Sequence, residues 1–198
     1  MTAASDPVAT LARALDQAGA VVAAVRPEQA TLPTPCRAWD VRTLVNHLVQ
    51  DVRQFAVTAQ GGRFQADDAD VIGDDWAGAY RQAADALLAV WRRPGVLERT
   101  VRLPIGEFTG SWRVGQQVAD VAVHAWDVAR ATGQPTELDP EVGQAALDWA
   151  RRNLQPRFRG EEGQAAFGAE VAVPADAPLY DRLAAFFGRD PAERSGPP

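Results

Sequence analysis

Two histidines in this chain lie in segments whose apolar residues have helical spacing. His47 stands in DVRTLVNHLVQD (residues 40–51), and His124 stands in VAVHAWDVARATGQ (residues 121–134). Asp120 precedes His124 by four residues, so their side chains lie on one ridge of a helix, beside its apolar stripe. If the two helices pack together, His47, Asp120 and His124 can converge in the interior.

Two imidazoles and a carboxylate suit a divalent metal ion such as zinc. Three protein ligands leave one coordination position open for water or a substrate. The same residues are also typical of ordinary helices, in which a histidine beside an apolar stripe is a hydrogen-bonded core residue. An aspartate four residues before a histidine is commonly a surface pair. The residues by themselves leave both interpretations open.

Asp127 lies three residues after His124, on nearly the same helix face. It could orient His124 or contact a bound ligand. The alternative is a helix-surface acid that pairs with Arg130 or Arg113.

Asp51 and Cys36 are two further candidates. Asp51, four residues after His47, could add a ligand, although a solvated helix acid is the simpler interpretation. Cys36 precedes a helix N-terminus, where the helix dipole favours a thiolate. With no histidine near it in sequence, a packed loop thiol is favoured over a nucleophile. As the single cysteine, it excludes an intramolecular disulfide and a multi-cysteine zinc site.

Helical periodicity dominates the first two thirds of the chain. It predicts helices over about residues 6–25, 40–61, 76–92 and 114–132. Four amphipathic helices favour a four-helix bundle. The long loop at 61–74 leaves room for a crossover, so a simple up-down-up-down order is not assured.

The remaining segments predict smaller elements. Residues 97–114 alternate around turn glycines, which indicates a short hairpin or extended arm. Helices are predicted at 140–153 and 179–187, with one short strand in 158–178. We therefore expect a mainly all-α chain, with a four-helix bundle at 1–135 and a C-terminal helical extension with little β-structure at 136–198, packed on the bundle.

Charge and composition narrow the function classes. The formal net charge is −6, and all 20 positive side chains are arginines. This balance argues against a nucleic-acid binder or a membrane-surface binder. The longest apolar run, AVVAAV, is far short of the roughly 20 residues that span a bilayer. With no signal-peptide pattern at the N-terminus, a cytoplasmic protein is expected.

Three motifs carry a family resemblance: TPCRAWDVRTLVNHLV (34–49), DVAVHAWDVARATGQ (120–134) and AAFFGRDP (184–191). They resemble an actinobacterial branch related to the mycothiol-dependent maleylpyruvate isomerases. That family belongs to the DinB-like superfamily of metal-binding four-helix bundles. The resemblance is collinear from the first helix to Pro191.

The resemblance implies a metal held by His47, Asp120 and His124, with no catalytic residue separate from that site. Zinc is the expected ion, and nickel or another divalent metal is the alternative. In the maleylpyruvate isomerases the acid is a glutamate, so Asp120 is one methylene shorter. Mycothiol is implied as the cosubstrate, and a homodimer is compatible with the superfamily.

Three functions follow as hypotheses. The first is a metal-dependent enzyme in which a small thiol attacks a small electrophile, giving transfer or isomerisation. The second is a non-catalytic metal- or ligand-binding protein with a stress-related or regulatory role. The third is a structural helical domain whose histidines and aspartates are satisfied core residues.

Overall fold

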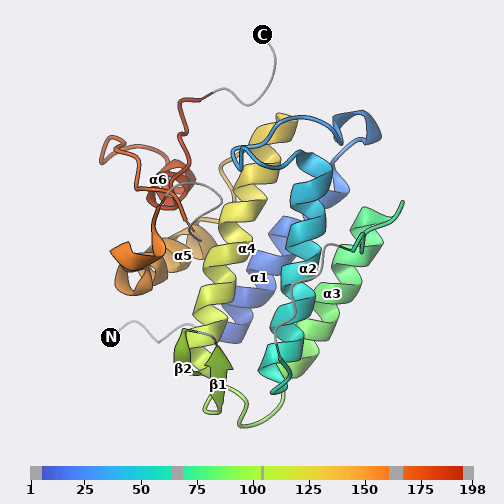
Figure 1. Cartoon of the computed structure of the whole chain (residues 1–198), viewed down its shortest axis with the longest axis vertical. Coiled ribbons are helices and arrows are strands. Elements are labelled where there is room, and N and C mark those ends of the chain that lie inside the picture. The colour runs from blue at the N-terminus through green and yellow to red at the C-terminus, as the bar shows by residue number, and fades with distance from the viewer. Residues whose placement is uncertain (1–5, 64–68, 104, 161–166, 194–198) are drawn as a thin grey trace.

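Four capped helices form the body of the molecule (Figure 1). In this computed structural model, residues 6–63, 69–103, 105–160 and 167–193 are described. The side chains of Asp6, Asp40, Asp75 and Thr109 each accept a hydrogen bond from a backbone N–H in the first turn that follows. Such caps satisfy donors that a helix start leaves free. The helices are α1 (Pro7–Ala23), α2 (Val41–Ala59), α3 (Trp76–Trp91) and α4 (Gly110–Thr132). The predicted bundle is confirmed.

Helix α4 starts earlier than the predicted Val114. The Thr109 side chain accepts a hydrogen bond from the Trp112 N–H at 3.2 Å and so begins the helix there. Gly110 allows this start, because a Cβ atom on it would lie 2.3 Å from the Val96 carbonyl oxygen. The helix ends at Gly133, which has a left-handed φ of 71° and is the predicted stop.

The order of the bundle is not up-down-up-down. Asn46 of α2 binds the segment that leads into α3. Its Nδ2 donates to the Ala69 carbonyl at 3.0 Å, and its Oδ1 accepts from the Val71 N–H at 2.8 Å. The Arg42 guanidinium lies over the Trp76 ring, so α2 and α3 begin side by side and run parallel. The connection from α2 to α3 is therefore a crossover, for which the sequence leaves room; residues 60–63 and 69–75 of it are described.

Helix α4 is buried on nearly every side. It packs against α1 and α2 within the bundle, and against α5 (Pro140–Asn153) and α6 (Leu179–Phe186) outside it. This explains why residues on its outer side, such as Asp127, are as inaccessible to water as those on its inner side. The helix that carries two of the expected metal ligands is the centre of the fold.

The predicted hairpin is present at one end of the bundle. Strands β1 (Thr100–Leu103) and β2 (Gly106–Thr109) are antiparallel, with Val101 opposite Phe108. The Phe108 ring stacks on Trp112 at 3.9 Å between centroids, which ties the hairpin to the first turn of α4.

The C-terminal extension is helical, with α5 and α6 close to their predicted bounds. Short 3₁₀ turns lie at Pro27–Gln29 and Pro156–Phe158. The strand predicted in 158–178 is wrong for the described part of that segment, which contains a single bridge between Arg159 and Phe167. Residues 161–166 lie outside the described ranges.

Among the described residues, no helix has the length and hydrophobicity needed to cross a membrane.

Candidate metal centre

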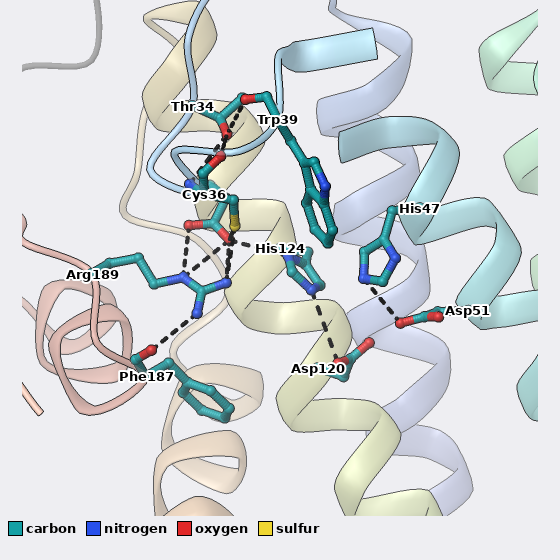
Figure 2. Close-up of polar contacts among 10 residues, drawn as sticks. Thr34, Cys36, Trp39, His47, Asp51, Asp120, His124, Phe187 and Arg189 are labelled. Carbon is teal, nitrogen blue, oxygen red and sulfur yellow. Dashed lines mark hydrogen bonds and ion pairs between the residues drawn. The ribbon is translucent and has the colours of Figure 1, made fainter. Parts of the chain in front are cut away.

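His47 and His124 face each other across the boundary between α2 and α4 (Figure 2). Their ring centroids are 5.2 Å apart and their planes are at 86°. The Trp39 ring, from the loop before α2, lies 4.3 Å from the His47 ring. Because α2 runs antiparallel to α4, the second turn of one helix meets the later half of the other. The structure therefore brings together the two histidines that the sequence pairs.

Asp120 lies one turn before His124 and completes the predicted trio. Its Oδ1 is 4.0 Å from His124 Nε2. Its Oδ2 is buried and has no hydrogen-bond partner among the described residues. Burial raises the pKa of this carboxyl group, although His124 and Arg113 oppose the shift. An unpartnered buried carboxylate oxygen is costly, and a bound cation is one way to satisfy it.

Asp51 adds a second carboxylate beside the trio. Its Oδ2 lies 3.2 Å from His47 Nε2. Burial and the charge of Asp120 raise the Asp51 pKa to about 7. Burial, reinforced by the charge of His124, lowers the His47 pKa to about 3, so this imidazole is neutral near pH 7. A neutral imidazole is the form that binds metals.

These four side chains fit a divalent cation. Two carboxylates repel each other in a buried place, and a metal ion of charge +2 would remove that repulsion while satisfying Asp120 Oδ2. The nitrogen and oxygen donor set suits zinc and neighbouring transition metals. His47, Asp120 and His124 could hold the ion, and Asp51 is close enough to His47 to add a ligand.

The other nitrogen of His124 is already occupied. Its Nδ1 lies 3.1 Å from Asp127 Oδ2, and Asp127 is fully buried. Burial acts to lower the His124 pKa, but the hydrogen bond to Asp127 and the charge of Asp120 raise it well above the usual value. Nε2 is therefore the nitrogen turned towards Asp120 and His47.

Arg189 is the partner of Asp127, and it comes from the C-terminal extension. Its Nη2 donates to Asp127 Oδ2 at 2.9 Å, and its Nε donates to Oδ1 at 3.2 Å. Although burial acts to raise the Asp127 pKa, the charge of Arg189 and the hydrogen bond from His124 hold it at about 2. Asp127 therefore remains an anion that accepts from both neighbours.

Of the two interpretations of Asp127, the contact with His124 is present and the alternative, a surface pair with Arg130 or Arg113, is wrong. Arg130 donates to the Pro191 carbonyl at 2.6 Å, and Arg113 lies over the Phe55 ring. Sequence reasoning missed Arg189, although the AAFFGRDP motif contains it. Local spacing cannot reveal a partner that lies 62 residues away.

Cys36 creates a second group of donor atoms. Its Sγ lies 3.4 Å from Asp127 Oδ2 and 3.2 Å from Arg189 Nη2. Cys36, His124 and Asp127 offer ligand atoms within 4.8 Å of one another. However, the guanidinium of Arg189 already neutralises this side of His124. The two carboxyl groups with raised pKa values, Asp51 and Asp120, lie on the Nε2 side, so a cation is better accommodated there.

Comparison with known proteins agrees with this architecture. The family model described as the mycothiol maleylpyruvate isomerase N-terminal domain matches residues 11–129. Two Mycobacterium tuberculosis proteins, from the strains CDC 1551 / Oshkosh and ATCC 25618 / H37Rv, are each 37% identical over 186 residues. Each alignment covers 93% of this chain and 98% of the relative, and both relatives are named as uncharacterized proteins. No solved structure gives a significant match. The family match and these full-length relatives establish that the chain belongs to the mycothiol maleylpyruvate isomerase N-terminal domain family.

Proposed function

We propose that this protein is a metal-dependent enzyme that uses a low-molecular-weight thiol, mycothiol, to modify a small electrophilic substrate. In this proposal His47, Asp120 and His124 hold the metal. The observation that carries it is Asp120 Oδ2, a buried carboxylate oxygen without a hydrogen-bond partner in the described part of the chain. The same carboxylate lies beside His124, whose ring is 5.2 Å from that of His47. Family membership supports the thiol.

Each side chain has a defined task. Asp120 supplies negative charge, and His47 supplies a neutral nitrogen beneath the Trp39 ring. His124 is held by its Nδ1, which leaves Nε2 for the metal. When bound, a divalent ion such as zinc would lower the pKa of a thiol and so favour the nucleophilic thiolate at neutral pH.

The arrangement of the site suits a reaction in which the thiol cosubstrate provides the nucleophile. Asp51 and Asp120 serve the cation in this proposal, and Cys36 is engaged with Arg189 on the far side of His124. The incoming thiol therefore acts as the nucleophile: its sulfur bonds to the electrophile and its proton passes to the substrate. The adduct is then either released as the product, or its new carbon–sulfur bond breaks, which releases the thiol and leaves an isomerised substrate. Transferase and isomerase outcomes share this first step.

Metal content is the first test. Protein purified without an affinity tag is analysed for stoichiometric metal, together with His47→Ala and Asp120→Ala. Asp85→Asn, on the exposed face of α3, is the matched control. We expect one ion per chain in the wild type and the control, and loss of it in both site variants. Unchanged metal in both site variants would overturn the assignment of the site.

Thiol dependence is the second test. Metal-loaded protein is incubated with mycothiol and a panel of small electrophiles, and adducts and isomers are followed by mass spectrometry and chromatography. Turnover that needs both the thiol and the metal supports the enzyme. Stoichiometric metal without any thiol-dependent product would instead favour a non-catalytic metal- or ligand-binding protein with a stress-related or regulatory role.

A further inference from the structure

We infer that Asp127 and Arg189 are positioning residues for His124, and that the C-terminal extension thereby forms part of the metal site. This inference rests on the proposed function, since the metal is the one held by His124. It assigns a role to a residue outside the stretch matched by the family model, residues 11–129.

The three side chains form a continuous buried line, with Asp127 between His124 and Arg189. Figure 2 labels the two ends of this line, His124 and Arg189. His124 Nδ1 lies 3.1 Å from Asp127 Oδ2. Arg189 donates two hydrogen bonds to the same carboxylate, from Nη2 to Oδ2 at 2.9 Å and from Nε to Oδ1 at 3.2 Å. The Asp127 side chain is fully buried, and those of His124 and Arg189 are 8% and 11% exposed. A guanidinium that donates two hydrogen bonds to one carboxylate compensates its charge and also fixes its orientation.

The backbone that presents Arg189 is itself held in place. Phe187 is buried, and its carbonyl accepts from Arg189 Nη1 at 3.0 Å. Gly188 has a left-handed φ of 86°, and a Cβ atom on it would lie 2.7 Å from the Gly168 Cα. Further along, the Pro191 carbonyl accepts from Arg130. Arg189 therefore approaches Asp127 from a defined direction.

The physical effect follows from burial. Without Arg189, the buried Asp127 carboxylate would lose the N–H donors that fix its position, and its hydrogen bond with His124 Nδ1 would no longer be held in one direction. The His124 ring would then lose its fixed orientation, and its Nε2 would become a poorer donor. Loss of such outer partners of metal-bound histidines typically weakens metal binding about 10–100-fold.

Metal affinity provides the first test. The zinc dissociation constant is measured by competition with a chromogenic chelator for the wild type, Arg189→Met, Arg189→Lys and Arg130→Met. Arg130 anchors the same segment through Pro191 without touching Asp127, so Arg130→Met controls for loosening of the tail. We expect Arg189→Met to weaken binding at least tenfold, with part of the loss recovered in Arg189→Lys and little change in Arg130→Met. Equal affinity in Arg189→Met and the wild type, or equal losses in Arg189→Met and Arg130→Met, would overturn the inference.

A measurement on the metal-free protein separates this inference from the proposed function. Proton NMR should detect the His124 Nδ1–H as a downfield, slowly exchanging signal in the wild type and in Arg130→Met. The signal should be lost or exchange rapidly in Arg189→Met and Asp127→Asn. If the wild type bound no metal, the proposed function would fail, while this signal would still decide whether the two residues position His124. Its absence from the wild type, or its persistence in both variants, contradicts the inference.

Discussion

Asp120 and Asp127 lie on the two sides of His124, and their carboxylates differ in how many hydrogen bonds they accept. Asp127 accepts from both His124 and Arg189, whereas Asp120 Oδ2 has no hydrogen-bond partner among the described residues. The pKa of Asp127 is lowered to about 2, and the pKa of Asp120 is raised. One carboxylate is thus satisfied by the fold, and the other is the one that we propose as a metal ligand.

Asp120→Asn should separate stability from metal binding. The amide removes a desolvated carboxylate whose pKa is raised in the folded state, so the metal-free variant should be more stable at pH 7 by about 1 kcal/mol. The same change should abolish the rise in unfolding temperature that added zinc produces in the wild type. Thermal unfolding with and without zinc measures both effects.

Asp85→Asn, on the exposed face of α3, is the control for that experiment. It should leave both the stability and the zinc response unchanged. A metal-free Asp120→Asn protein clearly less stable than the wild type would contradict the interpretation of Asp120 as an uncompensated buried group.

Cys36→Ala should keep the metal. Cys36 Sγ contacts Asp127 and Arg189 on the Nδ1 side of His124, away from Asp120. We expect the dissociation constant for zinc to stay within about threefold of the wild type, well below the tenfold or greater change typical when an outer partner of a ligand is lost. Loss of stoichiometric metal in this variant would instead place the ion among Cys36, His124 and Asp127.

Asn46→Ala should release the crossover from α2. The substitution removes two hydrogen bonds to residues 69 and 71, which should lower the free energy of unfolding by about 1–2 kcal/mol. Amide exchange, followed by mass spectrometry, should accelerate selectively at 69–73. Gln82→Ala, on an exposed position of α3, should change neither quantity, and unaltered exchange in Asn46→Ala would show that this side chain does not hold the crossover.

Tyr180→Phe should remove a pH-dependent part of the stability. Burial raises the Tyr180 pKa to about 12, and its hydroxyl donates to the Asp139 carbonyl at 3.0 Å. Because the folded pKa lies above the unfolded value of about 10, the stabilisation is complete below pH 10 and is lost as pH rises towards 12.

Denaturant unfolding across this pH range measures the effect. Near pH 8 the wild type should exceed Tyr180→Phe by about 1 kcal/mol, the value of one hydrogen bond. That advantage should shrink between pH 10 and 12. A constant difference between the two proteins would show that Tyr180 has the same pKa when folded and unfolded.

The sequence by itself determined the helices, because their apolar spacing and their caps are local properties. Asp40 caps α2 and Gly133 ends α4 as their positions predict. Spacing also identified Asp120 and His124 as neighbours on one ridge and placed His47 beside the apolar stripe of a second helix, and motif resemblance then implied a metal for the three residues. The start of α4 was missed because Gly110 depends on close contact with Val96, which local spacing does not show.

Only the tertiary structure decided which polar side chains pair with each other. Judged by residue type alone, Asp127 could pair with Arg130 or with Arg189. The C-terminal extension packs on the outer side of α4, and this packing brings Arg189 to Asp127. The same packing buries Asp127. Where α2 and α4 meet, Asp120 Oδ2 is left without a hydrogen-bond partner among the described residues. Burial and charge compensation arise between distant segments, so they follow from the packed fold and not from the order of residues along one helix.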